Sequence, residues 1–129
     1  MKKRLQLASF GMIGLISGCS PPAIDLEIRP VDDVRVVFLS QDWAPFGLKR
    51  KRPCVDKIEL REGASGDGKP IWTAKLVGSQ QCKRNFGAFI LGKTPPGFIS
   101  DREMPTLAVG KRYFLVVQGI GFAEVPFTY

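Results

Sequence analysis

Apolar and polar residues alternate along this chain in short runs that are separated by turn residues. From residue 24 to residue 29, aliphatic side chains occupy every second position and charged side chains lie between them. This period of two is typical of a β-strand with one buried face. Runs rich in β-branched and aromatic residues predict further strands at residues 34–39, 55–61, 71–77, 86–91, 113–118 and 122–129.

Glycine and proline clusters mark the connections between these runs. They predict loops at residues 41–53, 63–70 and 94–97, and an irregular or briefly helical turn at residues 100–110. About seven short strands without an amphipathic helix favour an all-β fold. We predict an antiparallel β-sandwich domain of immunoglobulin-like architecture over residues 24–129. We expect its core to contain the aromatic side chains of Trp72, Phe114, Phe122 and Phe127.

The N-terminal segment departs from this alternation. Basic residues at positions 2–4 precede about 14 mostly apolar residues, which are too few to span a bilayer as a helix. A basic start, a short apolar core and then small residues form the layout of a secretory signal peptide. The last four positions, Ile16, Ser17, Gly18 and Cys19, resemble the cleavage site (the lipobox) of bacterial lipoprotein signals.

This resemblance implies a lipid anchor at Cys19. It implies a cleaved signal helix at residues 1–18, transfer of diacylglycerol to the Cys19 thiol, acylation of the new amino group (for example with palmitate) and a lipidated tether at residues 19–23. In this family an aspartate directly after the cysteine retains the protein at the inner membrane. Ser20 stands there, which implies the outer membrane, with the periplasmic face expected. The alternative is an ordinary secretory signal that is cut nearby, with Cys19 incidental.

The numbers of cysteine and histidine residues limit the disulfide, metal-binding and catalytic chemistry that the chain can support. Lipidation of Cys19 would explain the odd number of three cysteines, and Cys54 and Cys82 then remain as a disulfide pair in an oxidising compartment. Free thiols or metal ligands are the alternative, although two cysteines without histidine do not make a zinc site. Because the chain has no histidine, it lacks the usual general base near neutral pH. We therefore predict no catalytic residue, no metal and no cofactor.

Charge points to one candidate contact site. The net charge is +7, but residues 1–18 hold three of the 19 Lys and Arg and no carboxylate. The remainder carries about +4, which gives little reason to expect a nucleic acid partner. Four consecutive cations follow an aromatic residue, namely Lys49, Arg50, Lys51 and Arg52 after Trp43. These five residues are candidates for contact with an anionic partner. The alternative is a solvated loop with Trp43 in the core.

Several downstream positions are similar to a recurring type of small proteobacterial lipoprotein. They are Cys54, Trp72, Cys82, the turn at residues 96–98 and the spacing of Leu107, Gly110 and Tyr113. This resemblance transfers no activity. We expect a non-enzymatic binding or assembly module close to the membrane, whose partner is an envelope protein or an anionic polymer. The alternative is an inhibitor or immunity factor against an enzyme that attacks the envelope.

Overall fold

The computed structural model describes residues 23–42, 50–63, 68–78 and 81–129. The expected signal segment with Cys19, and the candidate residues Trp43 and Lys49, lie outside these ranges. Across the described ranges, no helix has the length and apolar character needed to cross a bilayer.

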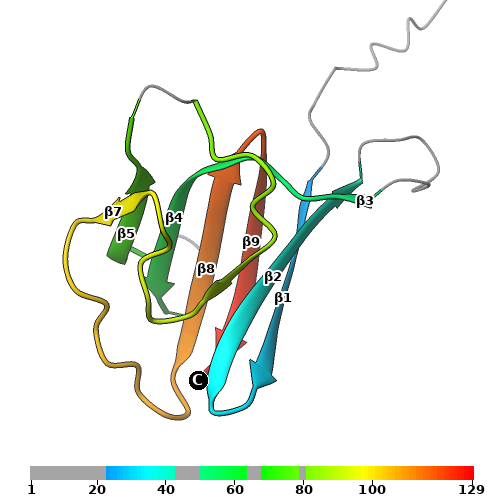
Figure 1. Cartoon of the computed structure of the whole chain (residues 1–129). Helices are drawn as coiled ribbons and strands as arrows, with labels where there is room; N and C mark the ends of the chain where they lie inside the picture. The colour runs from blue at the N-terminus through cyan, green and yellow to red at the C-terminus, as the bar shows by residue number, and fades with distance from the viewer. Residues whose placement is uncertain (1–22, 43–49, 64–67, 79–80) are drawn as a thin grey trace, which may run out of the picture.

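The described residues form two antiparallel sheets that pack as a β-sandwich (Figure 1), which confirms the predicted fold class. Their strands are β1 (Ile24–Val31), β2 (Val34–Asp42), β3 (Arg50–Lys51), β4 (Val55–Glu62), β5 (Pro70–Leu76), β6 (Ala88–Ile90), β7 (Phe98–Ser100), β8 (Arg112–Gly119) and β9 (Gly121–Thr128). The smaller sheet has the order β1-β2-β3, and β6 also pairs with β2. The larger sheet has the order β7-β5-β4-β8-β9.

The strand order agrees with the predicted immunoglobulin-like architecture. Immunoglobulin sandwiches place strands A, B, E and D in one sheet and strands C, F and G in the other, which C′ extends in variable domains. Here β1, β2 and β6 take the places of A, B and E, and β4, β8, β9 and β5 take those of C, F, G and C′. Among the described residues, no strand takes the place of D beside β6. The disulfide and β7 differ from that pattern, because the Cys54–Cys82 bond does not join the two sheets through B and F, and β7 adds to β5 after β6.

The inward-facing residues of both sheets form one core. Val37 and Leu39 of the smaller sheet pack with Ile58, Leu60 and Trp72 of the larger one. Trp72 has no exposed surface, as predicted. Burying each of these large side chains contributes about 1.5–3 kcal/mol. The alternation of the sequence therefore directs the packing of the two sheets.

Two details of the sequence prediction are wrong. The described residues contain two strands more than the expected seven, because β3 and β7 are too short to leave an alternating pattern. Phe122, expected in the core, is 47% exposed, since Ala123 and Val125 are the inward residues of β9. Phe114 is buried, as expected, although it lies on the opposite face of β8 from Leu115.

Candidate functional site

The candidate basic residues lie at one end of the smaller sheet. Arg50 and Lys51 form β3 and pair with Asp42 and Gln41 of β2. The expectation of a loop is wrong for these two residues, because β2 extends to Asp42 and pairs with them. Lys51 and Arg52 are exposed. The structure thus presents at least two of the predicted cations to solvent.

The same row of the sheet holds the first residue of β1. Ile24 is the Cα partner of Gln41, and Gln41 is the Cα partner of Lys51. Since neighbouring strands lie about 4.8 Å apart, Ile24 and Lys51 are about 10 Å apart. Five residues connect Cys19 to Ile24 and span at most about 18 Å. Any surface that holds Cys19 therefore lies at most about 28 Å from Lys51.

Gln41 links this row to the larger sheet. Its side chain is fully buried, and its Nε2 donates a hydrogen bond of 2.8 Å to the carbonyl oxygen of Ile120. Ile120 is the tip of the β8–β9 hairpin, and its backbone N–H donates to the carbonyl oxygen of Cys54 at 3.0 Å. We call this end of the sandwich, marked by Ile24, Gln41, Lys51 and Ile120, the near end.

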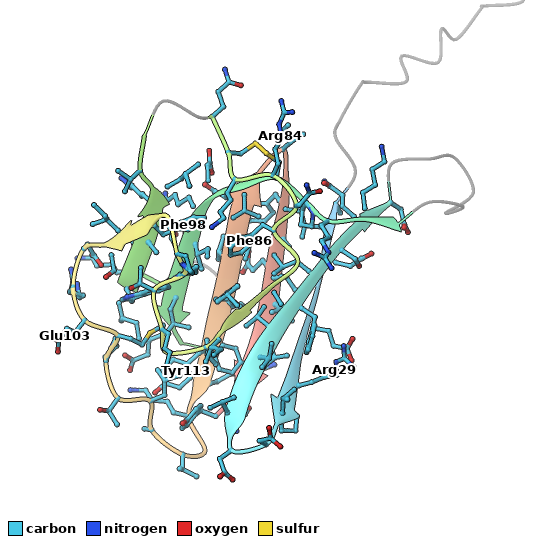
Figure 2. All side chains as sticks on the ribbon, in the orientation of Figure 1. Arg29, Arg84, Phe86, Phe98, Glu103 and Tyr113 are labelled. Carbon is cyan, nitrogen blue, oxygen red and sulfur yellow. A yellow bond between two sulfur atoms is a disulfide. The ribbon has the colours of Figure 1, made fainter. Side chains whose placement is uncertain are left out.

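The near end exposes apolar as well as basic side chains. Ile120 is 45% exposed and Phe122, two residues further along β9, is 47% exposed. Arg84, also exposed, lies two residues after Cys82 (Figure 2). Sequence analysis missed Ile120 and Phe122, although the glycines on either side of Ile120 marked it as a turn residue.

A disulfide fixes the segment that follows the basic residues. Cys54 and Cys82 are the pair that the sequence predicts, and their Cα atoms are 5.3 Å apart, within the range that a disulfide requires. Val55 and Lys83 exchange two backbone hydrogen bonds of 3.0 and 2.7 Å beside it. The backbone between Arg52 and β4 is therefore held in place on the larger sheet.

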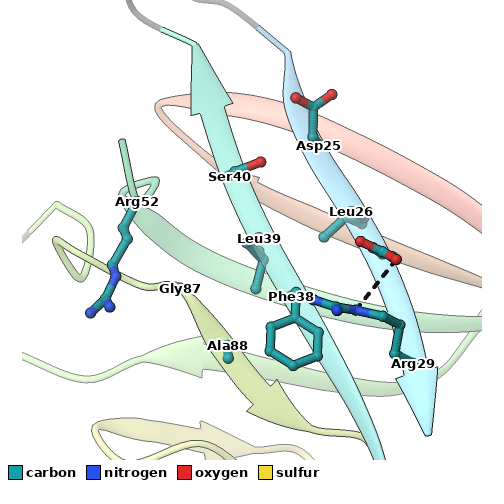
Figure 3. A pocket seen from close by; sticks show the side chains of 10 residues that line it. Asp25, Leu26, Arg29, Phe38, Leu39, Ser40, Arg52, Gly87 and Ala88 are labelled. Atoms are coloured by element: carbon teal, nitrogen blue, oxygen red, sulfur yellow. Dashed lines mark ion pairs between the residues drawn. The ribbon is translucent and has the colours of Figure 1, made fainter. Parts of the chain in front are cut away.

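A hollow of about 970 Å³ opens on the outer face of the smaller sheet, between Arg29 and Arg52 (Figure 3). The guanidinium of Arg29 lies 4.1 Å from the centroid of the Phe38 ring and pairs with Glu27, with 3.3 Å between Nε and Oε1. Asp25 completes a lining with two cations and two carboxylates. This balance favours no single ligand charge, so we assign no ligand to the hollow.

The opposite end of the sandwich, which we call the far end, exposes a second apolar group. Val31 and Val34 flank the β1–β2 turn and are each 41% exposed, Val109 is 89% exposed and Tyr129 is 37% exposed. The guanidinium of Arg35 stacks 4.4 Å from the centroid of the Tyr129 ring. With Val34, Val109 and Tyr129 it lines a hollow of about 410 Å³.

One ionised group is buried on the outer face of the larger sheet. Glu59 is 5% exposed and accepts from Arg61 Nη2 at 2.7 Å and from Lys57 Nζ at 2.5 Å. Burial by itself raises the pKa of Glu59. The hydrogen bonds and positive charges of Lys57 and Arg61 together outweigh this effect, so the pKa of Glu59 is below its ordinary value. Lys57 and Arg61, which lie on the same strand, pair with this carboxylate, so the three residues form an ion cluster that stabilises the fold.

Comparison of the chain with protein-family models, with curated proteins and with solved structures gave no match. Within the described part of the chain, no three residues of the types His, Cys, Asp and Glu gather as metal ligands would. The functional assignment therefore depends on the geometry of the two ends and on the N-terminal sequence.

Proposed function

We propose that the protein is a lipid-anchored envelope protein, held at the outer membrane through Cys19, that acts as a non-catalytic binding or assembly module. The observation that carries the proposal is that the near end and the far end lie at opposite ends of the sandwich. In the β1–β2 hairpin, Ile24 pairs with Gln41 at the near end and Val31 pairs with Val34 at the far end. The eight residues of β1 span about 24 Å. An anchor just before Ile24 would direct the far end away from the bilayer.

The chemistry of the far end supports a role in binding. Tyrosine and arginine are enriched among the residues that dominate protein–protein interfaces, and Arg35 and Tyr129 stack beside the exposed Val34 and Val109. Isolated exposed aliphatic residues need no explanation, but a group at one end of a small domain is typical of a contact surface. The lack of histidine in the sequence supports a non-catalytic role.

Intact-mass analysis of the protein from native membranes tests the anchor. We expect cleavage before Cys19, a mass increase from diacylglyceryl and acyl groups, and recovery in the outer-membrane fraction. A C19S variant should lack the modification and leave that fraction. An unmodified Cys19 thiol in the native protein would contradict the proposal.

Site-specific photo-cross-linking tests the binding role. A photo-reactive residue in place of Val109 should give one discrete protein adduct in cells. The matched position is Glu124, which is also exposed but lies on the outer face of β9 away from the far end. Adducts of the same pattern from both positions, or none from Val109, would argue against a binding surface at the far end.

A further inference from the structure

Three segments that are distant in sequence meet at the near end. They are β3 with Arg52, the residues 81–84 that follow β5, and the tip of the β8–β9 hairpin. Cys54 joins the second and third segments, because it forms the disulfide with Cys82 and its carbonyl oxygen accepts a hydrogen bond from Ile120 N. Gln41 joins the third segment to the first, because it pairs with Lys51 in the sheet and its Nε2 donates to Ile120 O. Arg84 and Ile120 line one hollow of about 550 Å³.

The exposed side chains of these segments are of two kinds. Lys51, Arg52 and Arg84 are cations that take part in no ion pair among the described residues. Ile120 and Phe122 are apolar, and each leaves nearly half of its surface in solvent. Apolar side chains flanked by Lys and Arg are the composition of surfaces that bind the head-group region of anionic bilayers.

The position of the tether indicates what binds to this surface. Ile24 shares a sheet row with Gln41 and Lys51, and Gln41 in turn holds Ile120. A lipid anchor on Cys19 would therefore bring the bilayer, before any other partner, to within a few tens of ångströms of the basic and apolar side chains. The anchor also raises their effective concentration at the membrane, so that a weak contact suffices.

We propose that the near end docks directly on an anionic bilayer. Ile120 and Phe122 lie in the head-group region, and Lys51, Arg52 and Arg84 contact lipid phosphates. This inference rests on the proposed lipid anchor and adds the lipid class and the contact residues. The hairpin tip is held by two backbone-carbonyl hydrogen bonds, from Ile120 to Cys54 and from Gln41 to Ile120, so it is ordered before docking and little entropy is lost.

The experiment uses the natural lipidated protein, inserted through its own anchor into phosphatidylcholine vesicles with or without phosphatidylglycerol. Amide hydrogen exchange is followed at residues 119–124 and 51–54. We expect slower exchange in both segments on the anionic vesicles only, and reversal of the effect at high salt, since such contacts are screened. Exchange at the far end, around Val109, should be the same on both vesicle types.

Two variants separate the contributions of charge and apolar contact. Because each basic residue near an anionic surface favours binding by about fivefold, K51E/R84E should weaken docking by at least about 30-fold and remove the protection. The matched control K69E/K93E makes the same charge change at exposed positions outside the near end. I120S/F122S should also remove the protection. Because nearly half of each side chain lies in solvent, this variant should stay folded, which a cooperative thermal transition checks.

The outcomes distinguish this inference from the proposed anchor. If the protein stays on the vesicles after a salt wash but residues 119–124 exchange equally on both vesicle types, docking is overturned and the anchor stands. Protection that persists in K51E/R84E, or that K69E/K93E removes equally, also overturns docking. If the native protein lacks the lipid and leaves the vesicles in the wash, the anchor itself fails.

Discussion

Gly119 is the position where one methyl group should do the most damage. It is the last residue of β8 and lies against the backbone of residues 54 and 55. A Cβ built on Gly119 would overlap the carbonyl oxygen of Cys54 and lie 2.8 Å from both the Cys54 carbonyl carbon and the Val55 Cα. All three atoms belong to the backbone beside the disulfide, so none of them can rotate away. We therefore expect G119A to displace the β8–β9 hairpin.

The magnitude follows from the bonds that this displacement breaks. The hydrogen bond from Ile120 N to Cys54 O is 3.0 Å long, and the bond from the buried Gln41 Nε2 to Ile120 O is 2.8 Å long. Each buried polar group that loses its partner costs about 1–3 kcal/mol. Together the two lost bonds predict a destabilisation of about 2–6 kcal/mol, a large fraction of the total stability of a small domain.

Urea unfolding followed by tryptophan fluorescence, to which the buried Trp72 contributes, measures this difference, and Gly87 supplies the control. Neither Gly119 nor Gly87 has a positive φ, so both substitutions test close approach alone. At Gly87 a Cβ would meet the side chain of Arg52 at 3.0–3.2 Å, and that side chain can shift. We expect G87A to stay within about 1 kcal/mol of the parent, including the small gain from a stiffer unfolded chain. A G119A domain within 1 kcal/mol of the parent would refute the reasoning.

Three further predictions concern stability. Replacing Cys54 and Cys82 by alanine opens a loop with a sequence separation of 28, and should cost about 3.6 kcal/mol in a urea titration, whereas an unchanged midpoint would contradict it. Because the folded pKa of Glu59 is below its ordinary value of 4.5, its stabilisation should be full above pH 4.5 and lost as the pH falls through the folded pKa. The decline of stability with falling pH should therefore be larger in the parent than in E59Q, and equal declines would contradict this. K75E should raise stability by about 0.5–1 kcal/mol at low salt, because Lys75 lies directly opposite Lys57, and the gain should vanish at high salt.

The fold could be predicted from the sequence where the pattern is local. β1 alternates apolar and polar residues, whereas β2 and β8 contain continuous runs of β-branched and aromatic residues. The turn between β1 and β2 is two aspartates, of which Asp32 adopts φ 52°. The disulfide followed from the cysteine count. The short strands could not be predicted, because β3 and β7 form only where β2 and β5 offer them a partner. A strand of two or three residues is too short to show an alternation of apolar and polar positions.

The candidate site was predicted only in part for a related reason. The basic residues stand next to each other in the sequence and are visible as a run, but the apolar hairpin tip lies far along the chain from them. Their meeting depends on Gln41, a polar residue that the alternation would place in a loop after Leu39. In the structure Gln41 is fully buried, because the carbonyl oxygen of Ile120, 79 residues away, accepts its hydrogen bond.

Gln41 therefore joins the fold to the proposed function. A buried amide that loses a hydrogen bond costs free energy, so displacing the hairpin tip from Gln41 Nε2 should lower the stability. Q41L should keep the approximate side-chain volume but lose the hydrogen bond that holds Ile120 in position relative to β3. If the near end docks on lipid as an ordered unit, Q41L should retain the anchor and weaken the protection of residues 119–124 on anionic vesicles. If the hairpin tip and the basic residues act independently, Q41L should leave that protection at the parent level.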